Sequence, residues 1–378
     1  MKKINILGIV ILLILSLGVI YGILIRPHFY RFNGGEVFLK PVFTSAKIDS
    51  SVEVKVMNES IYICDKNGLI KKNIEGGNIW SKSFYIETPM FIISKPFLAI
   101  ADITGKNAYV FNEDGLVYSV TESYPIISID ISPEGFLTTV MEDGERNYIN
   151  YYNNKGDKPV GIATNFIEDG YPITAAASKE VTKMATGYIS ITASRLESNV
   201  TFFGFADAYE SYEKKVVGSY RYDNSLITKV KWLNEQQLLA VFDNQFSIYQ
   251  FHKLPELKKT IETDARIQDI VSTDEEIVVL YGEALTSQGE SLKGTVCIYD
   301  FQGNVIQKIT EAEEIKGIYA DQEHFFIFKN GSVSRYAGKN RIWTSTTYVD
   351  LLEMHAVSEE RYIAVTEQGF SVFEISNK

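Results

Sequence analysis

Two segments of this sequence repeat each other in detail. Asn67-Gly68 and Asn330-Gly331 each follow an apolar, strand-like run. Twelve residues after each glycine stands a tryptophan, Trp80 in one segment and Trp343 in the other. An Asn-Gly pair of this kind predicts a β-hairpin with a type I′ turn, in which both central residues have positive φ. Similarity between two segments so far apart in the sequence indicates a repeat architecture, in which short strands bury a core by stacking on neighbouring units.

Strand-like runs continue from residue 36 to the end of the sequence. The 23 tyrosines and 22 phenylalanines favour strands, because aromatic side chains suit a pleated, half-buried surface. A unit of three or four such runs can be placed eight times, beginning near residues 52, 90, 126, 173, 227, 267, 315 and 351. The average unit is about 43 residues long, as expected for a four-stranded propeller blade. We therefore predict an all-β, eight-bladed β-propeller over residues 36–378, with seven blades as the alternative if two irregular units merge.

The last unit is one strand short. It contains Leu351–Val357, Tyr362–Val365 and Phe370–Ile375, whereas Val37–Phe43 near the other end belongs to no unit. A ring closed by an N-terminal strand in the last blade protects its sheet edges. We expect Val37–Phe43 to pair with Phe370–Ile375.

The first residues of the chain predict a membrane anchor. Ile6–Ile25 is an uncharged run long enough to cross the roughly 30 Å of a hydrocarbon core as a helix. A cleaved signal peptide has a shorter apolar stretch followed by small residues, so we expect the anchor to remain. The predicted division is residues 1–26 for a short cytoplasmic tail and transmembrane anchor, 27–35 for a linker and 36–378 for the propeller.

The orientation follows from an anchor so close to the N-terminus. Lys2 and Lys3 precede the anchor, and Arg26, Arg31 and Lys40 follow it, so the positive charges nearly balance. The usual outcome is a single-pass protein of the cell membrane with a cytoplasmic N-terminus and the propeller on the outer side. Gly18 and Gly22 form a GxxxG pattern that could pair helices in the membrane.

Charge and cysteine content exclude two classes of protein. The formal net charge of −11 would repel a phosphate backbone, so we expect no nucleic-acid partner. Cys64 and Cys297 lie in apolar runs far apart in the repeat order, so we expect two buried thiols and no disulfide.

No catalytic motif is present. The sequence lacks a nucleophile elbow, a phosphate-binding loop and a dinucleotide-binding fingerprint. His28 lies in the linker, and His252, His324 and His355 fall in separate units without metal-ligand spacing. The acidic pairs Glu313-Glu314 and Glu359-Glu360 are interpreted as exposed loops. We predict no catalytic, cofactor-binding or metal-binding residues.

Several short segments resemble known propeller repeats. Gly76–Trp80 and Gly338–Trp343 resemble the tryptophan-docking repeats of quinoprotein-type propellers, and Ala101–Lys106 resembles another part of that repeat. Ile131–Gly135 is similar to the Ser-Pro-Asp-Gly turn of WD40-like propellers. The whole layout resembles an uncharacterised family of Gram-positive, membrane-anchored propeller proteins. This resemblance implies that the tryptophans pin outer strands to their blades, rather than hold a quinone.

A closed repeat without catalytic motifs favours a binding function. We expect an extracytoplasmic, membrane-tethered scaffold that binds a protein, peptide or glycan of the cell envelope and is not an enzyme. The alternative is an envelope hydrolase or a quinone-dependent dehydrogenase that uses the propeller funnel. A third hypothesis is a sensor that couples ligand binding to helix pairing through Gly18 and Gly22.

Overall fold

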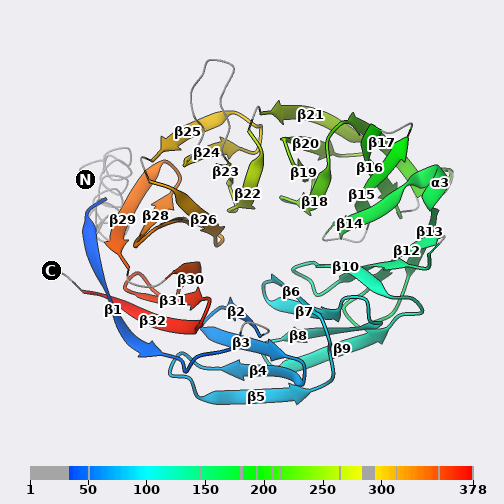
Figure 1. Ribbon diagram of the computed structural model, residues 1–378. Helices are drawn as coiled ribbons and strands as arrows, with labels where there is room; N and C mark the ends of the chain where they lie inside the picture. The colour runs from blue at the N-terminus through cyan, green and yellow to red at the C-terminus, as the bar shows by residue number, and fades with distance from the viewer. Residues whose placement is uncertain are drawn as a thin grey trace, which may run out of the picture.

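The computed structural model describes residues 34–376, apart from residues 50–51, 145, 179–181, 193–194, 207, 209, 213–214, 264, 283–293, 312 and 348–349. The predicted anchor, Ile6–Ile25, lies outside the described residues. Within them the chain is almost entirely β-strand, with a single short α-helix, α3 (Phe166–Asp169). The strands form sheets arranged radially around a ring (Figure 1).

Seven groups of four consecutive strands follow one another around the ring, and we call each group a blade. Neighbouring strands within a blade are antiparallel. Blades 1 and 2 contain β2 (Glu53–Met57), β3 (Ser60–Asp65), β4 (Gly68–Lys72), β5 (Asn78–Ser83), β6 (Pro89–Ser94), β7 (Phe97–Asp102), β8 (Asn107–Asn112) and β9 (Gly115–Thr121). Blades 3 and 4 contain β10 (Ile126–Ile131), β11 (Leu137–Glu142), β12 (Arg146–Tyr152), β13 (Val160–Asn165), β14 (Tyr171–Ala177), β15 (Lys183–Thr192), β16 (Arg195–Gly204) and β17 (Val216–Asp223).

The remaining complete blades have the same order of strands. Blades 5 and 6 contain β18 (Ile227–Trp232), β19 (Gln237–Phe242), β20 (Gln245–Phe251), β21 (Pro255–Glu262), β22 (Ile267–Ser272), β23 (Glu276–Tyr281), β24 (Thr295–Asp300) and β25 (Val305–Thr310). Blade 7 contains β26 (Ile315–Ala320), β27 (Phe325–Lys329), β28 (Ser332–Ala337) and β29 (Asn340–Thr346).

The last blade, which we call the closing blade, joins the two ends of the described chain. It consists of β30 (Leu351–Ala356), β31 (Arg361–Thr366) and β32 (Gly369–Ser376), completed by β1 (Glu36–Thr44). β1 pairs antiparallel with β32, with Leu39 opposite Ile375 and Phe43 opposite Val372. The predicted closure is therefore confirmed.

β1 makes a second contact that the sequence did not predict. Its first residues pair in parallel with β29, Glu36 opposite Thr344 and Val37 opposite Ser345. This short ladder joins blade 7 and the closing blade into one eight-stranded sheet.

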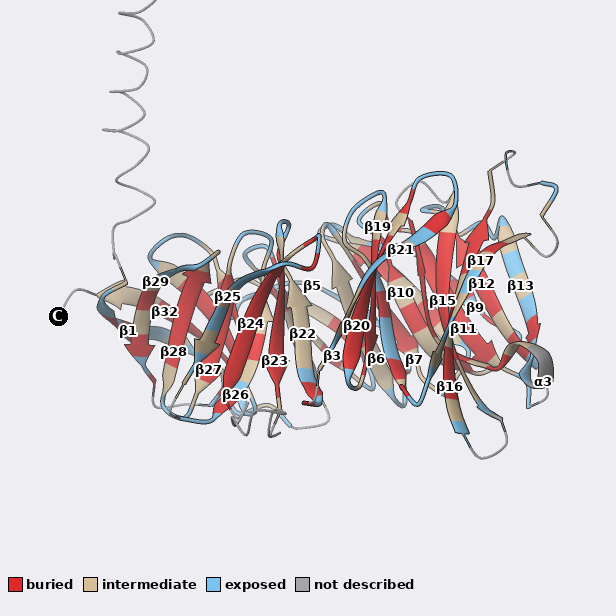
Figure 2. Ribbon diagram, turned by 90° about the horizontal axis from the view of Figure 1, so that it is seen from above, coloured by how far each residue is buried: buried red, intermediate tan, exposed pale blue. Residues whose placement is uncertain are grey.

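The core is divided among the junctions between blades. Eight clusters of buried side chains lie between consecutive blades, and the cluster that contains Val56 and Ile363 joins blade 1 to the closing blade. Figure 2 shows the buried residues concentrated in middle strands such as β23 and β24, whereas outer strands such as β21 are largely exposed. Each blade therefore buries both faces only because it has two neighbours, as a repeat fold requires.

The type I′ turns expected at the two Asn-Gly pairs are not present. Gly68 and Gly331 have φ values of 142° and 69°, whereas neither Asn67 nor Asn330 has positive φ. Gly68 pairs with Asp65 in its ladder, but Gly331 lies in the turn itself, because Ser332 pairs with Lys329. The two glycines are thus offset by one position. Only the glycine requires an unusual conformation, and at Gly68 a Cβ would also lie 2.1 Å from the Lys82 carbonyl oxygen.

The two tryptophans are structurally equivalent despite this offset. Trp80 pairs with Lys71 and Trp343 pairs with Arg335, and in both blades the ladder shifts by one residue directly afterwards. The same position in other outer strands also donates a hydrogen bond to the next blade. The four donors and their acceptors are Trp80 Nε1 to Glu113 O at 2.9 Å, Tyr118 OH to Gly135 O at 2.8 Å, Lys259 Nζ to Gly303 O at 2.8 Å and Trp343 Nε1 to Tyr362 OH at 3.2 Å.

The cysteine prediction is confirmed. Cys64 and Cys297 are both buried and unpaired. Burial raises the pKa of the Cys64 thiol to about 12, so it stays protonated at neutral pH.

Candidate functional site

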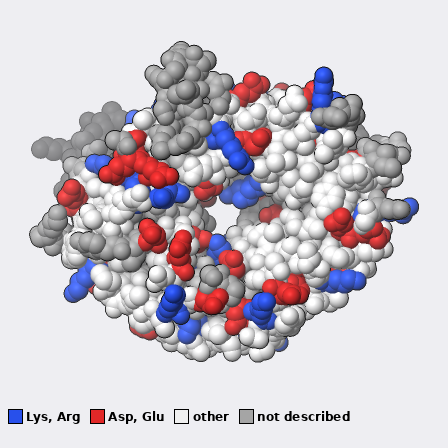
Figure 3. All heavy atoms as spheres, viewed as in Figure 1, with Lys and Arg blue, Asp and Glu red and all other residues white. Residues whose placement is uncertain are grey.

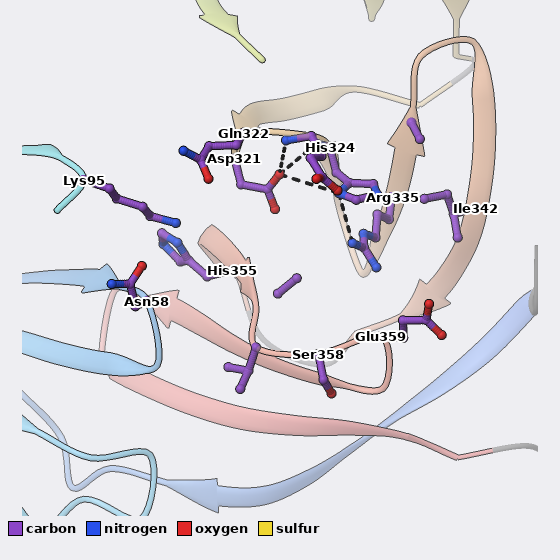
Figure 4. Close-up of a pocket in the computed structure, with 14 residues that line it drawn as sticks. Asn58, Lys95, Asp321, Gln322, His324, Arg335, Ile342, His355, Ser358 and Glu359 are labelled. Carbon is purple, nitrogen blue, oxygen red and sulfur yellow. Dashed lines mark hydrogen bonds and ion pairs between the residues drawn. The ribbon is translucent and has the colours of Figure 1, made fainter. Parts of the chain in front are cut away.

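A cavity of about 370 Å³ opens between blade 7 and the closing blade (Figure 4). Turns that join the first and second strands of four blades supply most of its wall, and the side of blade 7 completes it. The main lining residues are Asn58, Lys95, Asp321, Gln322, Glu323, His324, Arg335, Ile342, His355, Ser358 and Glu359. The volume is at the lower end of the range for small-ligand pockets, roughly 300–1,000 Å³. It suits one or two residues of a peptide or a single sugar ring.

The described chain begins on the same side of the ring as this pocket. The Gly34 amide donates to the carbonyl oxygen of Ile342, a lining residue, at 2.8 Å, and Arg341 Nη2 donates to the Gly34 carbonyl at 3.3 Å. We call this side of the ring, with its turns between first and second strands, the entry face.

A chain of hydrogen-bonded side chains runs beneath the pocket and crosses three blades. Lys55 of blade 1 pairs with Glu353 of the closing blade through Nζ and Oε1. The other carboxylate oxygen of Glu353 lies 3.2 Å from His355 Nε2, and His355 Nδ1 lies 3.0 Å from the hydroxyl of Tyr319 in blade 7. This chain ties together the inner strands β2, β30 and β26.

The electrostatics of this chain fix the protonation of each member. Burial lowers the pKa of His355, against the opposing effect of Glu353. Burial alone would raise the pKa of Glu353, but the hydrogen bond from His355 and the charge of Lys55 outweigh it, so the pKa is lowered. Burial raises the pKa of Tyr319. At neutral pH the arrangement is therefore a neutral imidazole that donates from Nε2 to a carboxylate and accepts at Nδ1 from the Tyr319 hydroxyl.

A second cluster holds the opposite wall of the pocket. Asp321 Oδ1 accepts hydrogen bonds from the backbone amides of Glu323 and His324, at 3.0 and 2.7 Å, and so fixes the turn. Burial alone would raise the pKa of the Asp321 carboxyl, but these bonds and the His324 ring lower it. Arg335, which is 7% exposed, contacts His324 Nδ1 at 3.1 Å and donates to the Tyr362 hydroxyl at 2.8 Å. Arg335 therefore links the His324 turn of blade 7 to Tyr362 of the closing blade and holds this wall of the pocket in place.

Lys95 completes the pocket from blade 2. It lies in the turn between β6 and β7, is half-buried, and Figure 4 shows its side chain extending toward His355. Lys95 forms no ion pair with any residue in the described ranges.

Basic side chains also border the central opening of the ring, which Figure 3 shows from the face of Figure 1. Lys229 and Lys231 stand two residues apart on β18, and Lys231 Nζ donates to Ser272 Oγ at 2.7 Å. Desolvation by the surrounding protein and the neighbouring charge of Lys229 lower the pKa of Lys231 to about 8. Burial raises the pKa of Asp130 on β10 to about 7, although Lys229 and Lys231 oppose this rise. Charges of both signs therefore interact near this opening.

No site residues are predicted from the sequence, which places His324 and His355 in separate repeat units. The structure brings both to one pocket, because blade 7 and the closing blade are neighbours. Asn58 reaches the same pocket from blade 1, which ring closure places beside the closing blade, and Lys95 reaches it from blade 2, the next blade along. No sequence motif marked this site. No group of three or more metal-ligating side chains occurs among the residues that the structure describes.

The radial sheets, the closed ring and the pocket at one mouth define a β-propeller. The chain belongs to a family of unknown function (DUF5711), whose model matches residues 40–375. No curated protein matches the sequence.

Solved structures show the same fold. The chain is similar to BamB from Moraxella catarrhalis, with a TM-score of 0.53 and 11% identity over 89% of this chain and 99% of that one. It is also similar to a eukaryotic initiation factor, with a TM-score of 0.53 and 10% identity over 89% of this chain and 91% of that one. The WD40 domain of Pan2 from Neurospora crassa aligns with a TM-score of 0.48 and 12% identity over 88% and 90% of the two chains. At these identities the first two similarities show the fold alone.

The predicted membrane segment is not among the described elements. Within the described parts of residues 34–376, no helix is long and apolar enough to span a bilayer.

Proposed function

We propose that the protein is an eight-bladed propeller anchored in the cell membrane by Ile6–Ile25, and that it works on the outer side as a binding scaffold. Its partner is a protein, peptide or glycan of the cell envelope, and it catalyses no reaction. The observation that carries this proposal is the pocket on the entry face, where turns from four blades meet around Lys95, which has no ion-pair partner among the described residues.

The position of Gly34 supports a partner close to the membrane. The predicted anchor segment ends at Arg26, so seven residues, or eight Cα-to-Cα steps, separate it from Gly34. Eight fully extended steps span at most about 28 Å. If residues 6–25 span the bilayer, Gly34, whose amide donates to the pocket-lining Ile342, lies within that distance of the membrane surface.

The geometry of His355 supports binding rather than catalysis. A general base needs a free ring nitrogen within reach of the substrate. Both nitrogens of His355 already contact protein groups, Tyr319 and Glu353. The chain from Lys55 to Tyr319 is therefore better suited to hold three blades together than to move a proton from a substrate.

Site-specific photocrosslinking in intact cells tests the proposed function. A photoreactive amino acid at Gln322, an exposed lining residue, should give discrete crosslinked species. The matched control is the same substitution at Gln368, which is exposed in the turn between β31 and β32. Identical products from both positions, or none from Gln322, would contradict a binding role for the entry face.

The enzymatic alternative has one observation in its favour, the Tyr319–His355–Glu353 chain itself. In a hydrolase, the Tyr319 hydroxyl would act as the proton donor, although its raised pKa makes it a weaker acid than an ordinary tyrosine. Full-length protein would then cleave nitrophenyl esters or glycosides, and Tyr319→Phe would abolish the cleavage. Activity that is absent, or unchanged in Tyr319→Phe, removes this alternative.

A further inference from the structure

The lysine in the pocket lacks a counter-charge. Lys95 is half-buried and lies beside the neutral ring of His355, with no carboxylate of the described residues within ion-pair distance. Among the described residues, its positive charge at the edge of the pocket is therefore not compensated by a carboxylate. The position therefore favours an anionic group supplied by a ligand.

Carboxylates surround the same mouth of the ring. Among the described residues, the turns between first and second strands carry an acidic residue in six of the blades, namely Glu59, Glu134, Glu235, Glu275, Glu323 and Glu359. Glu323 and Glu359 line the pocket and are exposed, and Figure 4 shows Lys95 and Glu359 on opposite sides of it. The negative electrostatic potential of these turns repels an anion with several charges and attracts a cationic group.

We propose that the pocket binds a zwitterionic ligand, of the class of a peptide that ends in a basic residue. The terminal carboxylate pairs with Lys95, and the side-chain ammonium pairs with Glu323 and Glu359. This inference rests on the proposed binding function and names the ligand class of the same site. A cavity of about 370 Å³ holds one such terminal residue and part of the next.

Three peptides test the contributions of the two ligand charges one at a time. The probes are acetyl-Ala-Ala-Lys with a free carboxylate, the same peptide as an amide, and acetyl-Ala-Ala-norleucine with a free carboxylate. Full-length protein in detergent is titrated with each peptide by calorimetry. The first peptide should bind at least about tenfold more tightly than either of the others, because each loses one charge-assisted hydrogen bond.

Two variants assign each charge to its partner. Lys95→Met should abolish the preference for the acid over the amide and keep the preference for lysine over norleucine. The double variant Glu323→Gln, Glu359→Gln should do the reverse. Lys258→Met, on the exposed surface of β21, is the matched control and should keep both preferences. Unchanged thermal unfolding of each variant shows that it has folded.

The result that overturns the inference is equal binding of the acid and the amide by the unmodified protein, binding of none of the three peptides, or a preference for the acid over the amide that survives Lys95→Met. Each of these outcomes is distinct from a failure of the proposed function. Discrete crosslinks from Gln322 without peptide binding would leave a scaffold with a different ligand.

Discussion

Lys55 and Glu353 form an ion pair between two strands that are neighbours in the ring but lie 298 positions apart in the sequence. Lys55 belongs to β2 of blade 1 and Glu353 to β30 of the closing blade. β1 completes the closing blade at its outer edge, whereas this pair holds its inner strand to blade 1. The ring is thus closed at two distances from its centre.

Loss of the Glu353 carboxylate should weaken the contact between blade 1 and the inner strand of the closing blade, which we call the inner seam. Glu353→Gln removes the negative charge and one of the two oxygens that accept from Lys55 and His355, and we expect the free energy of unfolding to fall by about 2–3 kcal/mol. This is less than the 3–5 kcal/mol typical of a fully buried pair, because the side chains of Lys55 and Glu353 are 30% and 17% exposed. Chemical denaturation measures the change. Glu256→Gln, which breaks the exposed pair with Lys258, is the control and should cost less than about 0.5 kcal/mol.

The same seam should weaken in acid. The pKa values of His355 and Glu353 are both lowered in the folded protein, so each group binds fewer protons folded than unfolded. The contribution of His355 is present above the ordinary histidine value of about 6.5 and is lost as pH falls through and below it, and that of Glu353 is lost below about 4.5. Thermal unfolding between pH 8 and 4 should show this decline. His355→Gln should flatten its upper part, and an unchanged profile in that variant would contradict the assignment.

The outer closure should depend on Leu39. This β1 side chain is 5% exposed and packs in the cluster between blade 7 and the closing blade. Leu39→Ala should lower the free energy of unfolding by about 2–4 kcal/mol, from lost burial and a residual cavity. Val42→Ala on the same strand is the control, because Val42 is 47% exposed, and it should cost less than about 0.5 kcal/mol. Similar losses in both variants would show that β1 is not anchored by its buried face.

The closure could be predicted because it leaves two traces in the sequence. The last unit lacks a strand, and Val37–Phe43 is a strand without a unit, so the two complete each other. The parallel pairing of Glu36 with Thr344 leaves no such trace, because a ladder of two residues imposes no pattern of side chains. Blade order and closure follow from strand periodicity, but such fine contacts do not.

The position of Trp80 and Trp343 in their outer strands, which we call the docking position, shows why only two units share a recognisable tryptophan motif. Trp80 and Trp343 fill it in blades 1 and 7, but Tyr118 and Lys259 fill it in blades 2 and 5. All four donate a hydrogen bond to the next blade from chemically different groups. A common geometry met by an indole, a phenol and an ammonium produces no sequence motif.

The pocket could not be predicted for a different reason. His324 and His355 come from separate units, and Lys95 comes from the other end of the ring. They meet because turns of equivalent position gather at the mouth of a closed ring. Spacing along the chain carries no information about that meeting.

The two docking tryptophans should contribute unequally to stability. Trp343 is fully buried, and its indole nitrogen donates to the Tyr362 hydroxyl, whereas Trp80 is only partly buried. Trp343→Phe should therefore cost about 2–3 kcal/mol, and Trp80→Phe about 1 kcal/mol, from the lost donor and the smaller ring. Chemical denaturation of both variants makes the comparison. Equal costs would show that the deeper burial of Trp343, at the junction of blade 7 and the closing blade, adds little to stability.

Asp130, near the central opening of the ring, should make the stability of the fold depend on pH in the direction opposite to that of the inner seam. Burial raises the pKa of Asp130 to about 7, so the folded protein binds more protons at this group than the unfolded chain does between about pH 4 and 7. The cost of the buried charge is absent in acid and grows as pH rises through this window. Asp130→Asn removes the charge and should stabilise the protein at pH 8 by about 1–2 kcal/mol, with little effect at pH 4. Thermal unfolding at both values tests this, with Asp157→Asn as an exposed-turn control of the same chemistry. Destabilisation of Asp130→Asn at pH 8 would mean that its attraction to Lys229 and Lys231 outweighs the cost of burial.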